Sequence, residues 1–263
     1  MPFPSSRAAR LAGLVCSLFV LAPSAGAVAA ERYVALGDSF SSGVGTGSYT
    51  LSSSCRRSVY AYPYLVSQQR PDTALAFVAC SGATTADVIA SQIQAVDAST
   101  TIVSVTIGGN DIGFADLIVQ CTLFNCSSTL DATRVLLPAV LNPRLDVVYT
   151  AIRNQAAFGA RVVVLGYPRM FGSFGCFGTL GVSSTERAKA NQLADALDVV
   201  IGARAAAYGF AYQSAIASWS THAVCSSSPW LNGLNLFNTV ESYHPNRSGN
   251  SLGYAPLVRS VIG

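Results

Sequence analysis

Short apolar segments alternate with longer amphipathic ones along this chain. The apolar segments are rich in β-branched and small residues, which favours strands. We predict strands at residues 32–36, 73–80, 100–109, 160–168 and 210–215. Between them, apolar residues recur at helical spacing, and we predict helices at 60–69, 82–96, 131–158, 183–209 and 245–261.

Helix-start and helix-break signals refine two of these segments. Ser183 and Glu186 have the spacing of a capping box at the start of the segment 183–209. Pro138 and Pro143 are expected to interrupt the helical pattern of the segment 131–158, because proline lacks the N–H that a helix interior requires.

Strands that alternate with helices predict an α/β protein. We expect a three-layer α/β/α sandwich around a central, mostly parallel five-stranded sheet. Ligands of such sheets bind at the carboxyl ends of the strands. Three glycine-containing polar segments follow the first three predicted strands, and they should meet at that edge: GDSFS (37–41), CSGATT (80–85) and GGNDIGF (108–114).

The first thirty residues have the pattern of a signal peptide. Arg7 and Arg10 precede the apolar run 11–22, and small residues continue to Ala30. We predict cleavage between residues 27 and 30 and an extracellular, secreted product. The remaining 263 − 30 = 233 residues, 31–263, have the size of one domain.

Charge and cysteine content narrow the possible partners. Without the two arginines of the leader, 14 basic and 13 acidic residues leave a formal charge of +1, with no basic run, so nucleic acid is not an expected partner. An even set of six cysteines in an exported domain favours disulfides. We expect the pairs Cys55–Cys80, Cys121–Cys126 and Cys176–Cys225.

The segment GDSFS allows a helix cap, a phosphate loop or a nucleophile at Ser39. The glycines at 43–47 do not make G-x-G-x-x-G, because Ser48 occupies the last position. Nor is this a G-x-S-x-G elbow, because Ser41 replaces the final glycine. A nucleophilic serine needs a base, and the chain has two histidines.

The two histidines differ in their surroundings. His222 lies in a serine-rich segment three residues before Cys225, which favours a structural role. His244 is followed by Pro245, which holds the residue before it in an extended conformation. Neither histidine lies at metal-finger spacing from a cysteine pair, and we expect neither metal nor cofactor.

Four blocks of the sequence together resemble the SGNH/GDSL hydrolase family. In order they are GDSFS at 37–41, Gly82, GGND at 108–111 and His244-Pro245. Each block alone is common, but four in this order cover nearly the whole mature chain. The export signal and the cysteines make the chain similar to the family's secreted bacterial lipase, esterase and phospholipase branch, which implies the flavodoxin-like fold of the family.

The resemblance also implies roles for individual residues. Ser39 would be the nucleophile and His244 its general base. The Ser39 and Gly82 backbone N–H groups and the Asn110 side-chain amide would form the oxyanion hole. Asp38 is expected to hold its turn rather than to carry a proton, and the same expectation applies to Asp111.

One position departs from the family pattern. Members usually have Asp three residues before the histidine, and here Glu241 occupies that place. Three alternatives stay open for orienting His244: a backbone carbonyl of Ser242 or Glu241, the Glu241 carboxylate, or no fixed partner.

Apolar residues near these blocks favour fatty acyl esters of the lipase, esterase or phospholipase A type over acetyl esters of carbohydrates or small molecules. The candidates for an acyl groove are Phe114, Leu117, Ile118, Phe124, residues 135–141, Met170, Phe171, Phe174, Phe177, Trp230, Leu231 and Leu234.

Two other classes remain as alternatives. An inactive binding protein on this scaffold should have lost Ser39, Asn110 or His244, and a metal-dependent phosphodiesterase needs more ligands than two isolated histidines. We expect a monomer with an acyl ester substrate, transient contact with lipid aggregates and no obligate protein partner.

Overall fold

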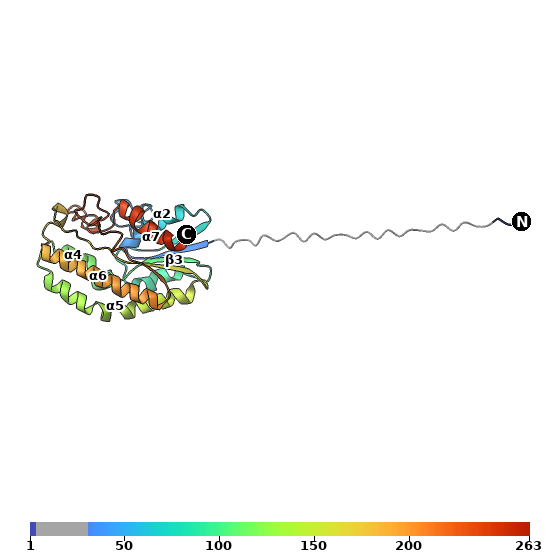
Figure 1. Cartoon of the computed structure of the whole chain (residues 1–263), viewed down its shortest axis with the longest axis horizontal. Coiled ribbons are helices and arrows are strands. Elements are labelled where there is room, and N and C mark those ends of the chain that lie inside the picture. The colour runs from blue at the N-terminus through green and yellow to red at the C-terminus, as the bar shows by residue number, and fades with distance from the viewer. Residues whose placement is uncertain (4–30) are drawn as a thin grey trace.

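The computed structural model describes residues 1–3 and 31–263 (Figure 1). Most of the predicted signal peptide, including its cleavage zone, lies outside the described residues. The first strand begins at Glu31, directly after that zone.

A single parallel sheet forms the centre of the fold, with strands in the order β2-β1-β3-β4-β5. This confirms the predicted α/β class and five-stranded sheet. The first strand extends one residue beyond its predicted range at each end, whereas the other four are shorter than predicted. After β2 the chain leaves the regular strand pairing, although the Cys80 N–H still donates to the carbonyl of Gly37 at the end of β1. The observed strands are β1 (Glu31–Gly37), β2 (Thr73–Phe77), β3 (Ile102–Thr106), β4 (Arg161–Leu165) and β5 (Ala211–Gln213).

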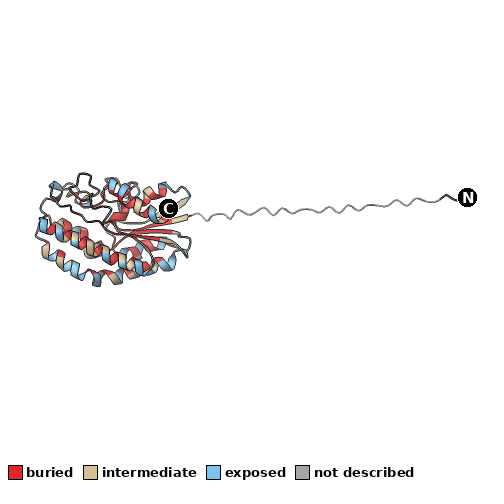
Figure 2. Ribbon diagram, in the orientation of Figure 1, coloured by how far each residue is buried: buried red, intermediate tan, exposed pale blue. Residues whose placement is uncertain are grey.

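Helices cover both faces of the sheet and make the three predicted layers. In Figure 1, α2 (Tyr62–Gln68) and α7 (Ala255–Ile262) lie on one side of the sheet, and α5 (Ser127–Gln155) and α6 (Ser184–Ala207) lie on the other. The central strand β3 is buried over its whole length, and Figure 2 shows the buried residues concentrated between the layers. Shorter helices occupy the loops: α1 (Ser39–Ser42), α3 (Thr85–Asp87) and α4 (Phe114–Gln120).

The prediction that two prolines interrupt the helix at 131–158 is wrong. Pro138 and Pro143 both lie inside the continuous helix α5. Each proline removes one backbone hydrogen bond at a cost of about 3 kcal/mol. The fully buried side chains of Leu137, Leu141 and Leu145 offset that loss by packing into the core.

The helix predicted at 82–96 is also different in the structure. The capping-box start at Thr84 gives only the short α3, followed by a π-helical turn at Val88–Gln92 and a 3₁₀ turn at Ile93–Ala95. The π turn carries the Gln92 side chain to the end of β1, where its amide bonds both the N–H and the carbonyl of Gly37 at 2.7 and 2.9 Å. That tertiary contact is not encoded by local propensity.

Two further helix predictions have mixed outcomes. The capping box of Ser183 and Glu186 is confirmed, since each binds the backbone N–H of the other. The helix predicted from Pro245 begins later, with a π-helical turn at Gly249–Tyr254 that leads into α7. Short 3₁₀ turns complete the chain at Asn110–Ile112, Phe177–Thr179 and Thr239–Glu241.

The three expected disulfides are present. Their Cα–Cα distances are 4.3 Å for Cys55–Cys80, 5.1 Å for Cys121–Cys126 and 5.6 Å for Cys176–Cys225. All three connect loops beyond the sheet, and the first joins the segment after α1 to the segment after β2. The bridges therefore fix loops at the carboxyl end of the sheet.

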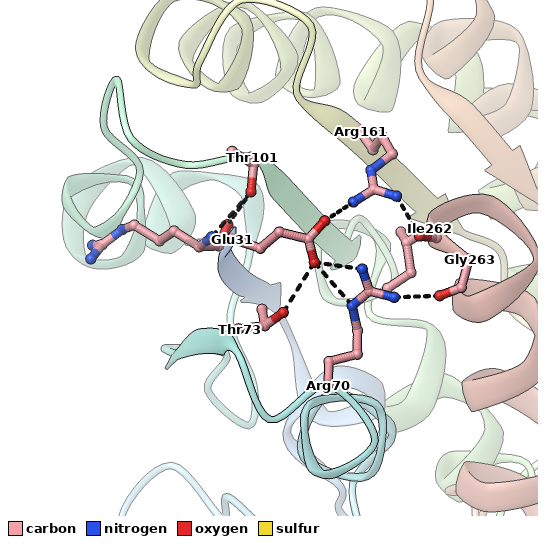
Figure 3. Close-up of polar contacts among 8 residues, drawn as sticks. Glu31, Arg70, Thr73, Thr101, Arg161, Ile262 and Gly263 are labelled. Atoms are coloured by element: carbon pink, nitrogen blue, oxygen red, sulfur yellow. Dashed lines mark hydrogen bonds and ion pairs between the residues drawn. The ribbon is translucent and has the colours of Figure 1, made fainter. Parts of the chain in front are cut away.

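At the opposite end of the sheet, the Glu31 carboxylate and two arginines connect the first strand to the C-terminal helix (Figure 3). Glu31 accepts hydrogen bonds from Arg70 and Thr73 and forms an ion pair with Arg161. The same two arginines donate to the backbone carbonyls of Gly263 and Ile262. The start of β1 is thereby tied to the end of α7, far from the loops that carry the candidate site.

Candidate active site

The chain turns sharply where β1 meets α1. Gly37 has a φ of +125°, and a Cβ there would lie 2.4 Å from the Thr106 carbonyl oxygen, so a side chain would collide with β3. Asp38 then caps α1 by accepting a hydrogen bond from the Phe40 N–H at 3.0 Å. Ser39 is the first residue of α1, and this geometry holds its hydroxyl at the carboxyl end of the central strands.

Asp38 has the contacts of a turn residue. Besides capping α1, its carboxyl accepts from the Thr106 hydroxyl at 3.0 Å and from the Tyr167 hydroxyl. Burial raises the pKa of Asp38 to about 6, although these hydrogen bonds oppose the rise. The bonds fill both carboxyl oxygens and join β1 to the ends of β3 and β4.

His244 connects Ser39 to a backbone carbonyl. Its Nε2 lies 2.8 Å from the Ser39 Oγ, and its Nδ1 lies 2.9 Å from the Ser242 carbonyl oxygen. A carbonyl can only accept, so Nδ1 must carry the hydrogen. In the neutral ring Nε2 is then the acceptor, and it is the atom that faces the Ser39 hydroxyl.

The Glu241 carboxylate points elsewhere. Its Oε1 accepts a hydrogen bond from the Tyr49 hydroxyl at 2.6 Å. The Glu241 backbone carbonyl is held by Asn232, whose amide also donates to the Gly45 carbonyl at 2.8 Å. Of the alternatives left open by the sequence, the geometry therefore favours the Ser242 carbonyl, with Glu241 anchoring the segment that presents it.

The loops after β2 and β3 bring Gly82 and Asn110 to the same pocket as Ser39 and His244. Gly82 has a φ of +82° and no atom within 4 Å of a Cβ position, so its backbone faces open space. The Asn110 side-chain nitrogen donates to the Ala83 carbonyl at 2.9 Å, which uses one of its two hydrogens. Asp111 joins the two loops by accepting from the Thr85 N–H and hydroxyl at 2.9 and 2.6 Å.

The pocket around these residues has a volume of about 560 Å³. Its apolar lining comes from Ala115, Val119 and Val240. None of the residues predicted for an acyl groove lines this pocket, and the prediction is wrong for those that are buried in the core. Most are core residues, with Phe114, Leu117, Ile118, Met170, Phe171 and Leu231 buried, while Phe124, Phe174 and Phe177 are exposed.

Four supporting residues were not anticipated from the sequence. Tyr49, Gln92 and Tyr167 each bond a site segment that is distant along the chain. Asn232 joins the nearby Glu241 carbonyl to the distant Gly45 carbonyl. No local pattern marks such contacts, since they depend on how the loops cross. Only Tyr167 carried a usable signal, because it lies near the end of the strand predicted at 160–168, at the edge where a site was expected.

Comparison with known proteins agrees with this geometry. Residues 35–252 match the model of the GDSL-like lipase/acylhydrolase family. The chain belongs to this family. As a member it is a carboxylic ester hydrolase of the lipase and acylhydrolase class, and the matched range includes both Ser39 and His244.

Relatives in the GDSL-like family extend along nearly the whole chain. Lipase 1 of Streptomyces coelicolor is 42% identical over 268 residues, covering 96% of this chain and 98% of that protein. A lipase of Streptomyces rimosus is 44% identical over 244 residues, covering 91% and 90%. The crystal structure of phospholipase A1 from Streptomyces albidoflavus superposes with a TM-score of 0.84 at 44% identity, covering 89% of this chain and all of that one.

The pH dependence of this site should have an unusually acidic limb. Burial, reinforced by the positive charge of Arg56, lowers the pKa of His244 to about 4, and the bond to Ser242 only partly opposes this shift. Below that pH both ring nitrogens are protonated and His244 cannot accept the Ser39 proton. We expect kcat/KM on a soluble p-nitrophenyl ester to fall only below about pH 4, measured where circular dichroism shows an intact fold.

The Arg56→Gln variant provides the matched test. Removing the positive charge should raise the pKa of His244 and move the acid limb to higher pH. A limb near the ordinary histidine value of about 6.5 in the parent protein would contradict the prediction.

Loss of the Glu241 carboxylate should have a moderate effect. Because it bonds Tyr49 rather than His244, we expect Glu241→Ala to lower kcat by less than about a hundredfold, well short of the loss of a triad acid. Tyr49→Phe removes the same hydrogen bond from the other side and should have a similar effect. A loss from Glu241→Ala as large as that from His244→Ala, with Tyr49→Phe nearly silent, would instead make Glu241 the orienting acid.

Proposed function

We propose that this protein is a secreted hydrolase of fatty acyl esters that works through an acyl-enzyme on Ser39. The observation that carries the proposal is the chain of hydrogen bonds from Ser39 through His244 to the Ser242 carbonyl. These residues line a pocket together with Gly82 and Asn110. This arrangement places a nucleophile, a base of fixed tautomer and candidate oxyanion donors together.

In the first half-reaction the Ser39 oxygen attacks the ester carbonyl carbon as its proton passes to His244 Nε2. The Ser242 carbonyl accepts from Nδ1–H throughout, so the imidazolium that forms stays in place. When the tetrahedral intermediate collapses, the carbon–oxygen bond to the alcohol breaks and Nε2 returns the proton to that alcohol. Water then repeats the sequence on the acyl-enzyme and releases the fatty acid.

We assign the oxyanion hole to the Ser39 and Gly82 backbone N–H groups and the second hydrogen of the Asn110 amide. Within residues 1–3 and 31–263, neither backbone N–H donates to another group. Donors that are preorganised for the developing negative charge contribute about 3–4 kcal/mol each to transition-state stabilisation.

The substrate class follows from the relatives and from the pocket. The similar proteins are named as lipases and a phospholipase A1, and Ala115, Val119 and Val240 give one side of the pocket an apolar surface. A similar structure is described as an extracellular lipase. Together with the disulfides, this supports a secreted domain of residues 31–263 released from a signal peptide of residues 1–30. We propose in addition that the domain acts as a monomer.

Hydrolysis of a panel of esters tests the proposal. We expect the mature protein to cleave p-nitrophenyl esters and at least one of phosphatidylcholine and a triglyceride, with fatty acid release followed by titration. Activity confined to acetyl esters, including acetylated sugars, would refute the fatty acyl assignment.

A further inference from the structure

Seven large apolar side chains project from the loops beside the active-site pocket. Each is more than half exposed, from 53% for Leu180 to 102% for Phe237. We refer to this set as the apolar collar: Leu123, Phe124, Phe174, Phe177, Leu180, Leu236 and Phe237.

The loops that carry the collar lie side by side. The Leu234 N–H donates to the Gly178 carbonyl at 2.8 Å, which joins the third loop to the second. Gly181 packs against the first loop so closely that a Cβ would lie 2.1 Å from the Thr122 carbonyl oxygen. Disulfides fix the first two loops, through Cys121–Cys126 and Cys176–Cys225.

The same segments adjoin the catalytic pocket. The pocket lining includes Val119 and Gln120, next to the first collar loop, and Thr239 and Val240, next to the third. The three loops follow β3, β4 and β5, so they emerge at the end of the sheet where Ser39 lies. The collar therefore borders the entrance on one side.

An exposed group of phenylalanines and leucines is costly in water and marks an interaction surface. The charge of the surrounding segments identifies the partner. Residues 119–126, 172–183 and 231–243 contain neither Lys nor Arg, and their one acidic residue is Glu241, whose carboxylate is bonded to Tyr49. Arg187 follows the second loop; its guanidinium donates to the Val182 carbonyl and lies against Gly175, where a Cβ would be 3.2 Å from it.

We propose that the apolar collar inserts into the surface of an uncharged, zwitterionic lipid layer. The proposal rests on the proposed function, because the layer would supply the acyl ester. With the collar inserted, the pocket entrance faces the lipid, and an acyl chain reaches Ser39 without crossing water. Because the three loop segments contain no basic residue and the neighbouring Arg187 is already bonded to the Val182 carbonyl, anionic headgroups should add little to binding, which distinguishes this mode from electrostatic membrane binding.

Vesicle binding without turnover tests the collar. In a Ser39→Ala background, flotation with phosphatidylcholine vesicles should recover the protein, and Phe237→Ser or Phe177→Ser should each weaken partitioning by about tenfold, the effect of withdrawing one large apolar side chain. Phe158→Ser is the matched control, because Phe158 is 109% exposed but lies between α5 and β4 at the opposite end of the sheet. Addition of phosphatidylglycerol should not strengthen binding.

Turnover distinguishes failure of this inference from failure of the proposed function. With Ser39 intact, Phe237→Ser should hydrolyse a soluble p-nitrophenyl ester like the parent but hydrolyse vesicle phosphatidylcholine about tenfold more slowly. If the parent protein did not hydrolyse the soluble ester, the proposed hydrolase function would be refuted. The flotation experiment tests the collar separately, because it requires no turnover.

Three outcomes would contradict the proposed lipid insertion. Vesicle binding could be unaffected by Phe237→Ser and Phe177→Ser, it could be weakened equally by Phe158→Ser, or it could require anionic lipid. A dimer in analytical ultracentrifugation that becomes a monomer in Phe237→Ser would show that a second copy covers the collar instead.

Discussion

Ser39→Ala should lower turnover of a soluble ester by roughly 10⁴- to 10⁶-fold and leave the fold intact. In the proposed mechanism the Ser39 hydroxyl is the group that attacks, and no other hydroxyl lies against His244 Nε2 in the described part of the chain. Alanine keeps the backbone N–H, so the residual rate should reflect the oxyanion donors alone. The measurement is kcat on a p-nitrophenyl ester beside thermal unfolding of both proteins.

Ser41 offers the matched control two residues along the chain. It is completely buried, and its hydroxyl bonds Tyr62 and Thr106 rather than the pocket. Ser41→Ala should cost about 1–3 kcal/mol of stability but keep turnover within about tenfold of the parent. A serine-directed organophosphorus reagent should label Ser39 alone, and an active Ser39→Ala protein or a label elsewhere would disprove the assignment.

The fold was predictable wherever the sequence signal is local. Strands such as β3, in which all residues except Ser104 are β-branched and all are buried, have the continuous pattern that is typical of a central parallel strand. The capping box at Ser183 and Glu186 is equally local. In contrast, α5 continues through Pro138 because of what Leu137 and Leu141 pack against, and no window of sequence contains that information.

The candidate site divides in the same way. Ser39, Gly82, Asn110 and His244 lie in short motifs at strand ends or beside the last helix, and the parallel topology brings them together. The orientation of the Glu241 side chain depends on Tyr49, nearly two hundred residues earlier, so the sequence could only leave alternatives open.

The identity of the pocket lining could not be predicted for a related reason. An apolar residue in a loop can face the core, a pocket or solvent, and composition does not separate the three. Phe114 is buried and Phe177 is exposed, and neither lines the pocket. The pocket is lined instead by the smaller Ala115 and Val119 of α4, which alternate along that helix with the buried Phe114, Leu117 and Ile118.

His244→Ala should lower kcat on the soluble ester by roughly 10⁴- to 10⁶-fold, as much as Ser39→Ala. Without the ring, the Ser39 proton has no acceptor and the leaving alcohol has no donor. His222→Ala is the matched control, because the His222 ring stacks on Trp230 at 3.7 Å and bonds the Ser228 carbonyl, outside the pocket. It should retain full turnover.

The double variant distinguishes a coupled pair from two independent contributors. Ser39 and His244 share one proton, so once either is removed the other has no further role in the reaction. The Ser39→Ala, His244→Ala protein should therefore be no slower than either single variant, leaving the residual rate that the oxyanion donors supply. If the two losses instead multiplied, Ser39 and His244 would be acting on separate steps, and the 2.8 Å contact between Nε2 and Oγ would not be the path of the proton.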